Sequence, residues 1–550
     1  MANHYDAIVI GGGHNGLTAG AYLARDGANT IVLEKRYKVG GAADTSTPWP
    51  EHPDYKVTTY SYVSGLIPPS LVRDLRLEGY GYKIFPMGPV YQAYPDGRSL
   101  QFGHSDSNAN QTRIAKFSKK DADNLGEYYE WLEELAGILG PLLLKVPPKL
   151  GSKKPGDLID LGQLAWGLRR HISQKTIADF TRMMTMSLTD FLDDWFESEE
   201  LKGILAIDGV IGTWAGPDEP GTAYVLLHHA ITDIGDGQLS NWGFPEGGMG
   251  AVADSFRRAA ESFGCKVRTE AGVEKIIVAN GRAKGVVLEN GEELYAPVIV
   301  TATHPQITFL KQIERRDLPE DFVTDIERWK SRSGTVKVNL ALDRLPNFTA
   351  DPNPKDGSIP RHLTGSVELS FSPRYVEQAF QDAKAGKGAE GPFSDGVIPT
   401  VVDKTLAPEG VHIMSLFTQW CPQEWVDGPH QEELDAYATR IIKLYDELAP
   451  GFESSIIAKQ VLGPWHIEQD LGMIGGNIFH GELSASQLFH LRPAPGYADF
   501  RSPIKGLYQA HSGTHGGGGV NGIPGRHAYR QIKKDRALSP KRRRVDGVTA

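Results

Sequence analysis

The apolar residues near the start of the chain fall into two short runs separated by a longer amphipathic stretch. Residues 5–13 (YDAIVIGGG) predict a strand ending in glycines, residues 14–27 (HNGLTAGAYLARDG) a helix, and residues 28–34 (ANTIVLE) a second strand. This order forms one βαβ unit, which predicts a parallel sheet built from the N-terminus.

The pattern changes three more times along the chain. Between about residues 120 and 235, longer amphipathic stretches predict a helical insertion. Residues 265–302 return to short β-branched runs broken by Asn-Gly pairs, which favour hairpins. An irregular region from about 306 to 490 contains one clear strand candidate, TVKVNLALD, and residues 506–534 predict a strand, a glycine loop and a helix.

Segments typical of a dinucleotide-binding fold therefore lie at both ends of the chain. A chain of 550 residues is also too long for one hydrophobic core of ordinary size, so more than one domain is expected. We predict an α/β protein with a discontinuous Rossmann-like cofactor domain, an inserted α+β substrate domain and a helical cap. The expected boundaries are 1–70, 235–305 and 490–536 for the cofactor domain, 71–234 and 306–489 for the substrate and cap domain, and 537–550 for a disordered basic tail.

Composition narrows the functional classes. A formal net charge of -10 argues against a nucleic-acid partner, because phosphate binding calls for a basic face. The two cysteines, Cys265 and Cys421, are far apart in sequence, which argues against a local redox dithiol or a zinc site. We see no secretory signal and no apolar run of 18 residues, so we expect a cytoplasmic protein, with membrane association left open.

The glycines between the first strand and helix carry the strongest chemical signal. Gly11, Gly13 and Gly16 form G-x-G-x-x-G, and Glu34 ends the following strand. The first glycine permits a tight turn, the second lets the backbone approach a pyrophosphate, and the third lets helix and strand pack closely. A helix N-terminus at His14 and Asn15 would face the phosphates, and Glu34 would accept hydrogen bonds from a ribose. We predict a dinucleotide site.

The fingerprint alone fits FAD and NAD equally, and the next segment separates them. The sequence LEKRYKVGGAA resembles the second glycine motif of the amine-oxidase and phytoene-desaturase flavoproteins, in which this loop lies along the FAD. The resemblance implies FAD as the cofactor and contacts from Lys35, Arg36, Gly40, Gly41 and Ala42. Amine oxidases often have arginine at the position of Ala42, so the resemblance favours the desaturase branch.

Two later segments extend this resemblance to the middle and the end of the chain. The block beginning PEGGMGAVADSF resembles the middle of the superfamily, which implies adenine contact from the backbone at Val273. GLYQAHSGTHGGGGVNGIPGRHA resembles the C-terminal flavin block, with Gly516 where a proline usually stands. The further cofactor contacts that the resemblance implies are Thr301, Gly513, Gly518, Gly519, Val520 and Asn521.

Within this superfamily the chain most resembles the group named pyridine nucleotide-disulfide oxidoreductase domain-containing protein 2. The likeness runs through GTAYVLLHHA, NIFHGELSASQLFHLRP and SGTVKVNLALDRLPNF. The group name is a poor guide to chemistry here, because disulfide exchange has no evident nucleophile without a local cysteine pair.

A lysine and two histidines are the candidates for chemistry. Lys337 resembles the amine-oxidase lysine that holds a water near flavin N5, although a lysine on the exposed face of a strand would carry the same sequence. His511 and His515 flank the glycine loop and could shuttle protons or simply cap its backbone. His228 and His229 lie on an apolar segment and are interpreted as packing residues, with lining of the pocket as the alternative. No spacing predicts a metal site.

A second fingerprint for NAD(P) is missing, so the electrons should come from the substrate and leave to oxygen, a quinone or another acceptor. We expect hydride abstraction from a small, largely apolar substrate, as in desaturases. An amine oxidase and a flavin-binding scaffold with little turnover are the alternatives. Residues 135–150 (LAGILGPLLLKVPPKL) could face lipid or a channel, or simply form a cap helix, and a homo-oligomer is left open.

Overall fold

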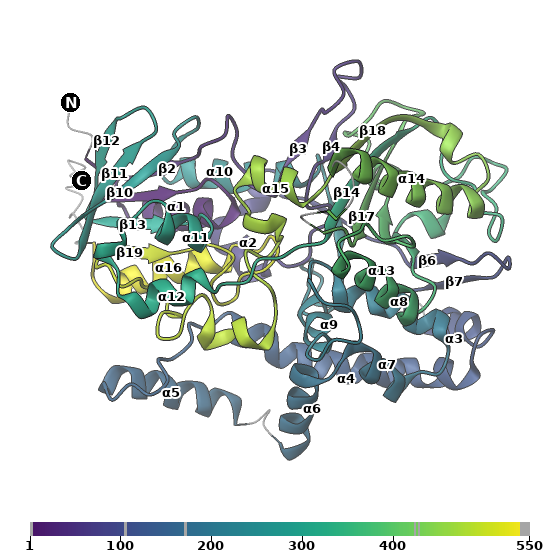
Figure 1. Ribbon diagram of the computed structural model, residues 1–550, viewed down its shortest axis with the longest axis horizontal. Coiled ribbons are helices and arrows are strands. Elements are labelled where there is room, and N and C mark those ends of the chain that lie inside the picture. Colours follow the sequence, from purple (N-terminus) through teal and green to yellow (C-terminus); the bar gives the residue numbers. More distant parts are fainter. Residues whose placement is uncertain (1–3, 104–106, 170–172, 423–424, 427–429, 539–550) are drawn as a thin grey trace, which may run out of the picture.

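The protein has two sheets side by side and a layer of helices beneath them (Figure 1). The computed structural model describes residues 4–103, 107–169, 173–422, 425–426 and 430–538. Most of the predicted basic tail, residues 539–550, lies outside the described residues.

The first sheet is five-stranded and parallel, in the order β19-β13-β1-β2-β9. Its strands are β1 (Ala7–Ile10), β2 (Thr30–Leu33), β9 (Lys266–Arg268), β13 (Val298–Thr301) and β19 (Leu507–Gln509). They come from three distant stretches of the chain, and the predicted discontinuous Rossmann-like fold is therefore confirmed. The domain boundaries themselves stay a prediction.

Both faces of this sheet are covered, because each strand carries apolar residues on both sides. Ala7 and Val9 of β1 pack into one core with three helices, whereas Ile8 and Ile10 pack into a second core on the opposite face. The helices are α1 (His14–Arg25), α10 (Met249–Ser262) and α16 (Ile523–Lys534).

The second core is closed by an antiparallel sheet of β10 (Val273–Ala279), β11 (Arg282–Leu288) and β12 (Glu293–Tyr295), together with α11 (Pro305–Leu310) and α12 (Glu320–Glu327). The predicted hairpin is confirmed at the first Asn-Gly pair, where Asn280 and Gly281 have φ values of 52° and 66°. Positive φ at both central residues is what a tight hairpin turn requires.

The inserted region contains a mixed seven-stranded sheet. Its order is β18 (Ile456–Leu462), β14 (Thr335–Leu342), β17 (His412–Gln419), β16 (Phe393–Val397), β15 (Ser366–Leu369), β6 (Val90–Ala93) and β7 (Ser99–Phe102). All eight residues of β14 are buried, so the predicted strand lies inside the domain, where it is the second strand from one edge of the sheet.

Most of the predicted helical insertion covers one side of this sheet, whereas α5 (Pro155–Leu168) lies away from it (Figure 1). The insertion consists of α4 (Lys119–Leu143), α5, α6 (Gln174–Thr185), α7 (Leu188–Trp195), α8 (Glu199–Val210) and α9 (Ala223–His229). The remaining helices are α2 (Pro69–Leu75), α3 (Ser107–Ile114), α13 (Pro373–Lys384), α14 (His430–Leu448) and α15 (Pro464–Leu471), and the remaining strands are β3 (Thr45–Ser46), β4 (Val57–Thr58), β5 (Ile84–Pro86) and β8 (Gly243–Pro245).

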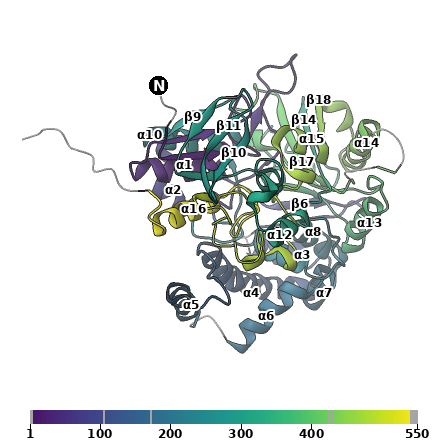
Figure 2. The same ribbon diagram turned by 60° about the vertical axis from the view of Figure 1, so that its left-hand side comes forward.

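The apolar stretch 135–150 begins inside α4. Leu135, Leu139 and Leu143 are buried in the core, so this part of the stretch packs against protein. Helix α5 differs, because none of its residues is buried and it lies at the edge of the molecule in both views, joined to α16 by an ion pair between Asp160 and Lys534 at 2.6 Å (Figure 1, Figure 2). Within the described ranges, no helix combines the length and apolar character needed to cross a bilayer.

Candidate functional site

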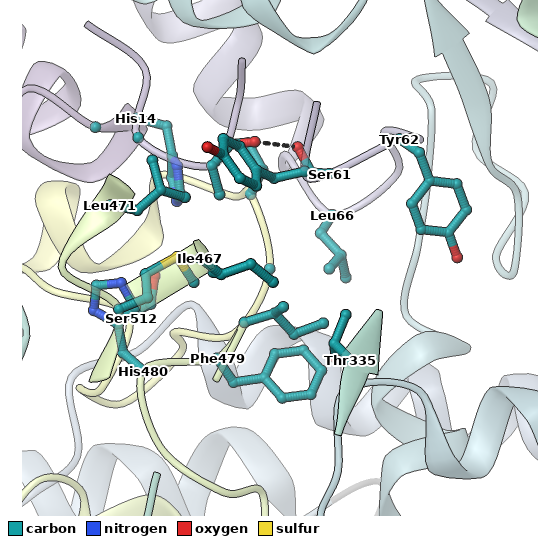
Figure 3. A pocket seen from close by; sticks show the side chains of 18 of the residues that line it. His14, Ser61, Tyr62, Leu66, Thr335, Ile467, Leu471, Phe479, His480 and Ser512 are labelled. Carbon is teal, nitrogen blue, oxygen red and sulfur yellow. Dashed lines mark hydrogen bonds between the residues drawn. The ribbon is translucent and has the colours of Figure 1, made fainter. Parts of the chain in front are cut away.

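One large cavity of about 850 Å³ runs from the glycine turn of the parallel sheet into the space between the seven-stranded sheet and the cap helices. Its two ends draw on different parts of the chain. Figure 3 shows His14, His480 and Ser512 on one side of the pocket and Tyr62 and Thr335 on the other. The cavity therefore joins the glycine turn after β1, which we call the nucleotide-type turn, to the space between the seven-stranded sheet and the cap helices, which we call the inserted chamber.

The geometry of the glycine turn matches the roles predicted for it. Gly11 has φ of +97°, a conformation that favours glycine. A Cβ at Gly16 would lie 1.9 Å from the carbonyl oxygen of Gly11, so only glycine lets helix and strand pack this closely. A Cβ at Gly13 would meet nothing nearer than 3.9 Å, which leaves room beside its backbone for a bound group.

Glu34 is held rigidly at the end of β2. Its two carboxylate oxygens accept hydrogen bonds from the backbone N–H groups of Gly12 and Arg36, each at 2.8 Å. The side chain is buried and lines the cavity. Each carboxylate oxygen has a second lone pair, so the fixed carboxylate can still accept hydrogen bonds from ribose hydroxyls.

The second glycine motif packs directly on the first. The N–H of Gly40 donates to the carbonyl of Gly12 at 2.9 Å, and Gly41 lines the cavity beside Gly13. The buried carboxylate of Asp44 accepts from Arg36 at 2.8 Å and also from Lys38, and these contacts anchor the loop. Both glycine motifs thus face one strip of the cavity.

The C-terminal glycine loop, residues 511–522, lies against the same part of the cavity. Asn15 donates to the hydroxyl of Ser512 at 3.0 Å, which joins residues almost five hundred positions apart. Arg492 is fully buried and holds this region together by donating to main-chain carbonyls. The acceptors are the carbonyl oxygens of Phe479, Gly481, Glu482, Gln487 and Ser512.

These residues fit FAD. The cavity side of the glycine turn has no Cβ to exclude a pyrophosphate, the fixed carboxylate of Glu34 suits a ribose, and buried His14 lines the same strip of the cavity as Gly519. Burial lowers the pKa of His14 to about 4, so its ring is neutral. No cluster of His, Cys, Asp or Glu in the described part of the chain could hold a metal.

Most of the predicted cofactor residues line the cavity. They are Gly11, Gly13, His14, Asn15, Gly16, Glu34, Lys35, Arg36, Gly41, Ala42, Val273, Gly519 and Val520. Gly40, Thr301, Gly513, Gly518 and Asn521 do not line it, and lie behind those that do. Asn521 donates to the carbonyls of Gly516 and Gly518, and therefore shapes the loop. These cofactor contacts stay predictions.

The two histidines of the C-terminal loop turn away from the cavity. His515 lies 3.2 Å through Nε2 from the carbonyl of Leu142, and His511 lies 3.1 Å from the side-chain oxygen of Gln509. Burial lowers the pKa of His515 to about 4 and that of His511 well below its usual value. Both rings therefore make structural contacts outside the glycine loop's own backbone, His515 with α4 and His511 with a neighbouring side chain. His229 lines the cavity, which was the alternative to its interpretation as a packing residue.

Lys337 lies inside the cavity and not on an exposed strand face. Its side chain is 1% exposed, its Nζ donates to Ser415 at 2.6 Å, and the same atom lies 4.5 Å from the centre of the Tyr62 ring. Burial lowers the pKa of Lys337 to about 7, although the nearby Asp395 carboxylate acts in the opposite direction. The amine can therefore exchange a proton near neutral pH.

Sequence reasoning missed three acidic residues near Lys337. Asp208, Glu368 and Asp395 line the cavity from α8, β15 and β16. Glu368 and Asp395 are buried in strands in which most residues are apolar or small, and this unusual placement is the signal that could have identified them.

Comparison with known proteins agrees with this site. The pattern of the family described as FAD dependent oxidoreductase matches residues 6–323. The pyridine nucleotide-disulfide oxidoreductase domain-containing protein 2 of Rattus norvegicus is 38% identical over 549 aligned residues, which cover 96% of this chain and 94% of the relative. A limonene dehydrogenase subunit of Castellaniella defragrans (strain DSM 12143 / CCUG 39792 / 65Phen) is 26% identical over 561 residues, covering 97% of this chain and 95% of the relative.

The fold is also found in the solved structure of an oxidase. Cyclohexylamine oxidase from Brevibacterium oxydans IH-35A superposes with a TM-score of 0.56 over 96% of this chain and 99% of that one, at 16% identity. At this identity the likeness concerns the fold alone. The match to the family pattern and the full-length relative together establish that the chain belongs to the FAD-dependent oxidoreductases.

Proposed function

We propose that this protein removes a hydride from one carbon atom of a largely apolar small molecule and a proton from the neighbouring atom, which forms a double bond, with FAD as the acceptor of the hydride. Oxygen, a quinone or another acceptor then takes the electrons. The observation that carries the proposal is the inserted chamber, which opens directly onto the nucleotide-type turn within one cavity.

The chamber walls are mostly apolar and aromatic. The lining side chains come from α4, α8, α9 and the seven-stranded sheet, and include Leu132, Ile204, Leu205, Ile211, Leu226 and Phe417. An apolar wall binds an apolar substrate by removing both surfaces from water. It also keeps water away from the reacting atoms.

FAD, when bound, would supply the two-electron chemistry, and the protein would supply position and electrostatics. Lys337 is the residue of this chain best placed to hold or move a proton in the chamber, because its amine is buried and titrates near neutral pH. Its partners Ser415 and Tyr62 fix where that proton can go.

The name of one relative supports a hydrocarbon-like substrate. The limonene dehydrogenase chain of Castellaniella defragrans aligns over nearly the whole of this protein, so the inserted chamber is part of the aligned region. A dehydrogenase named for limonene favours dehydrogenation of an apolar molecule over disulfide exchange.

Anaerobic reduction of the bound flavin tests the proposal. The purified holoprotein is titrated with isoprenoids, fatty alcohols and amines, and bleaching of the oxidised flavin absorption is recorded. We expect at least one apolar compound to bleach the flavin. A protein that keeps its flavin oxidised with every compound would favour a flavin-binding scaffold, and a colourless protein that FAD cannot reconstitute would remove the basis of the proposal.

Reoxidation kinetics test the role of Lys337. If its amine takes part in proton movement beside the flavin, Lys337→Met should slow reoxidation of the reduced protein by oxygen about tenfold or more. The flavin content of the variant serves as the control for folding. Unchanged turnover and unchanged reoxidation would exclude the role.

We also propose that α5 rests on an anionic lipid surface. This helix of fourteen residues is largely apolar, yet it exposes Leu158, Ile159, Leu161 and Trp166, which a helix packed in a core would bury. Residues 145–169 contain five Lys or Arg and two Asp, a positive segment in a chain of net charge -10. Exposed apolar side chains beside basic ones are typical of helices that lie in a membrane interface.

Vesicle binding tests this contact. The protein should sediment with vesicles containing phosphatidylserine more than with phosphatidylcholine alone, and Trp166→Ser with Ile159→Ser should abolish the difference. The matched control is Ile457→Ser, an exposed apolar residue on β18, far from α5 in Figure 1. Equal binding of both lipids, or a vesicle-free dimer that the α5 substitutions dissociate, would contradict the proposal.

A further inference from the structure

Lys337 belongs to a short row of polar side chains on two neighbouring strands. Asn339 follows it by two residues on β14, so both side chains lie on the same face of the sheet. Ser415 of β17 is paired directly with Asn339 across the two strands. We call Lys337, Ser415 and Asn339 the polar row.

Asn339 lies behind the cavity wall. Thr335 and Lys337, on the same face of β14, line the cavity, but Asn339 does not, and its side chain is buried. Burial of an amide costs free energy unless its polar groups are paired. The partners of Asn339 therefore show what its amide does at this place.

The partners of the Asn339 amide define its orientation. Its Nδ2 lies 3.2 Å from the main-chain carbonyl oxygen of Thr59 and 3.0 Å from Oε1 of Gln460 on β18. A main-chain carbonyl can only accept a hydrogen bond, so the atom that faces it must be the amide nitrogen. Oδ1 of Asn339 therefore faces the opposite way, towards Ser415.

This orientation decides the direction of the next two hydrogen bonds. Oδ1 of Asn339 can only accept, so the Ser415 hydroxyl donates its single proton to it, at 2.8 Å. Ser415 Oγ can then only accept from Lys337, whose Nζ lies 2.6 Å away. Lys337 is thus a donor to Ser415 in its charged and in its neutral form. The lone pair of the neutral amine cannot be used by Ser415 and is left for a proton from the inserted chamber.

The other end of the Asn339 amide holds the segment that supports the cofactor site. Thr59, whose carbonyl accepts from Asn339, donates through its own N–H to the carbonyl of Asp44 at 3.0 Å. The side chain of Asp44 anchors the second glycine motif. Three residues after Thr59, the ring of Tyr62 lies 4.5 Å from Nζ of Lys337. Hydrogen bonds therefore connect the second glycine motif to Lys337 by way of Asn339.

We infer that Asn339 is a positioning residue for Lys337: through Ser415 it fixes the direction of the lysine's hydrogen bond, and through Thr59 it holds the amine in register with the second glycine motif. A leucine at position 339 would fill a similar volume and fix neither. The inference rests on the proposed function for the role of Lys337 in moving a proton, and it adds the residue that prepares Lys337 for that role.

Other groups also act on Lys337. Burial lowers its pKa to about 7, whereas the carboxylate of Asp395 on β16 favours the charged form, and the hydroxyl of Tyr62 donates to that carboxylate. Changes in the polar row leave these groups in place. The further titratable groups that line the inserted chamber from the surrounding elements are Asp208 of α8, Glu368 of β15, His229 of α9, and Tyr128 and Tyr129 of α4.

Ser415→Ala tests the direction of the hydrogen bond. If Ser415 accepts from Lys337, it stabilises the ammonium form, so its removal should lower the pKa of Lys337, by about one unit. A hydroxyl that donated to the neutral amine would have the opposite effect, and its removal would raise this pKa. The sign of the shift therefore reports which way the bond points.

Asn339→Leu tests the origin of that direction. Without Oδ1 of Asn339, the Ser415 hydroxyl can turn and donate to the neutral amine, so the pKa of Lys337 should again fall by about one unit. The hydroxyl then serves both forms of the lysine, and Ser415→Ala in the Asn339→Leu chain should lower the pKa by less than half as much. Equal effects of Ser415→Ala in both chains would overturn the inference, because independent groups add.

Carbon-13 NMR of the holoprotein labelled at lysine Cε measures this pKa directly. The signal that disappears in Lys337→Met identifies the residue, and near pH 8.5 it should be that of a neutral amine, whereas exposed lysines with pKa values of about 10.4 stay charged. An unchanged or raised midpoint in Ser415→Ala would overturn the inference. This single variant is decisive even if Asn339→Leu fails to fold.

Gln460→Leu is the matched control. It removes a partner of Asn339 on the side away from Ser415 and leaves the bonds to Thr59 and Ser415 in place. The midpoint of Lys337 should therefore stay within about 0.3 unit of that in the unmodified protein. A shift as large as that of Asn339→Leu would mean that packing of the strands sets the pKa, and would overturn the role of Asn339.

Reoxidation of the photoreduced flavin by oxygen separates this inference from the proposed function. If Lys337 moves a proton during that step, the pH at which the rate changes should follow the NMR midpoint in each variant. Midpoints that shift as expected under an unmoved rate profile would support the positioning by Asn339 and contradict the role proposed for Lys337. Unshifted midpoints, together with a rate that depends on Lys337, would overturn the inference and support the proposed role.

Discussion

Replacing Glu34 by glutamine offers a sharp test of the cofactor geometry. The two oxygens of the carboxylate accept the backbone N–H groups of Gly12 and Arg36 and have lone pairs left for the ribose. Glutamine keeps the shape but removes the charge and turns one acceptor into a donor, which then faces a backbone N–H.

The magnitude follows from the bonds that change. Hydrogen bonds to charged groups contribute about 1.5–3 kcal/mol each, and ribose recognition by Glu34 uses one or two of them. Loss of about 2–3 kcal/mol corresponds to a Kd for FAD raised by roughly 30- to 150-fold. Binding of ADP to the apoprotein should weaken by a similar factor, because ADP carries the same ribose.

The assay is fluorescence titration of the apoprotein with FAD, and Lys275→Met is the control. Lys275 forms an exposed ion pair with Glu314 and does not line the cavity, so its loss should change the affinity less than fivefold. A Glu34→Gln protein that is folded and binds both FAD and ADP within threefold of the unmodified protein would refute the assignment of Glu34 to the ribose.

Three further outcomes are expected. Arg492→Met should lower the free energy of unfolding by about 3 kcal/mol or more, because buried carbonyls lose their donors, and a loss below 1 kcal/mol in urea unfolding would contradict this. Lys337 has a pKa of about 7 when folded and 10.5 as its ordinary value, so the unfolded chain binds more protons between these values and stability from this residue rises with pH. Lys337→Met should therefore be more stable than the unmodified protein at pH 7, by an amount that shrinks towards pH 9.5, and a constant difference would be inconsistent with the shifted pKa. Cys265 and Cys421 are buried with raised thiol pKa values, so a thiol reagent should label neither until the protein is unfolded, and rapid labelling of the native protein would reopen thiol chemistry.

The cofactor half of the site could be predicted because its constraints are local in sequence. The spacing of Gly11, Gly13 and Gly16 reflects one turn, and Glu34 follows at the end of the next strand. The same logic could not fix the ring directions of His511 and His515, because these depend on Leu142 and Gln509.

The sequence could mark Glu368 and Asp395 as unusual in their strands, but it could not show that they meet Asp208. Asp208, Glu368 and Asp395 come from three elements separated by long stretches of chain, and nothing in their neighbours says that they meet. The lipid-facing hypothesis concerned residues 135–150, whereas the exposed apolar helix is α5, because an apolar pattern is equally compatible with a buried helix such as α4 and an exposed one.

The contact between Asn15 and Ser512 has a consequence for how the protein is made. The first strand leaves the ribosome early, yet its neighbour β13 follows some 290 residues later and the outer strand β19 only near the end of the chain. Until β13 has been synthesised, one edge of β1 in the newly made N-terminal βαβ unit has no neighbouring strand, and an unpaired edge favours aggregation. Flavin can be captured in full only after synthesis is almost complete, so a shortage of FAD should show itself as loss of newly made chains and not of mature protein.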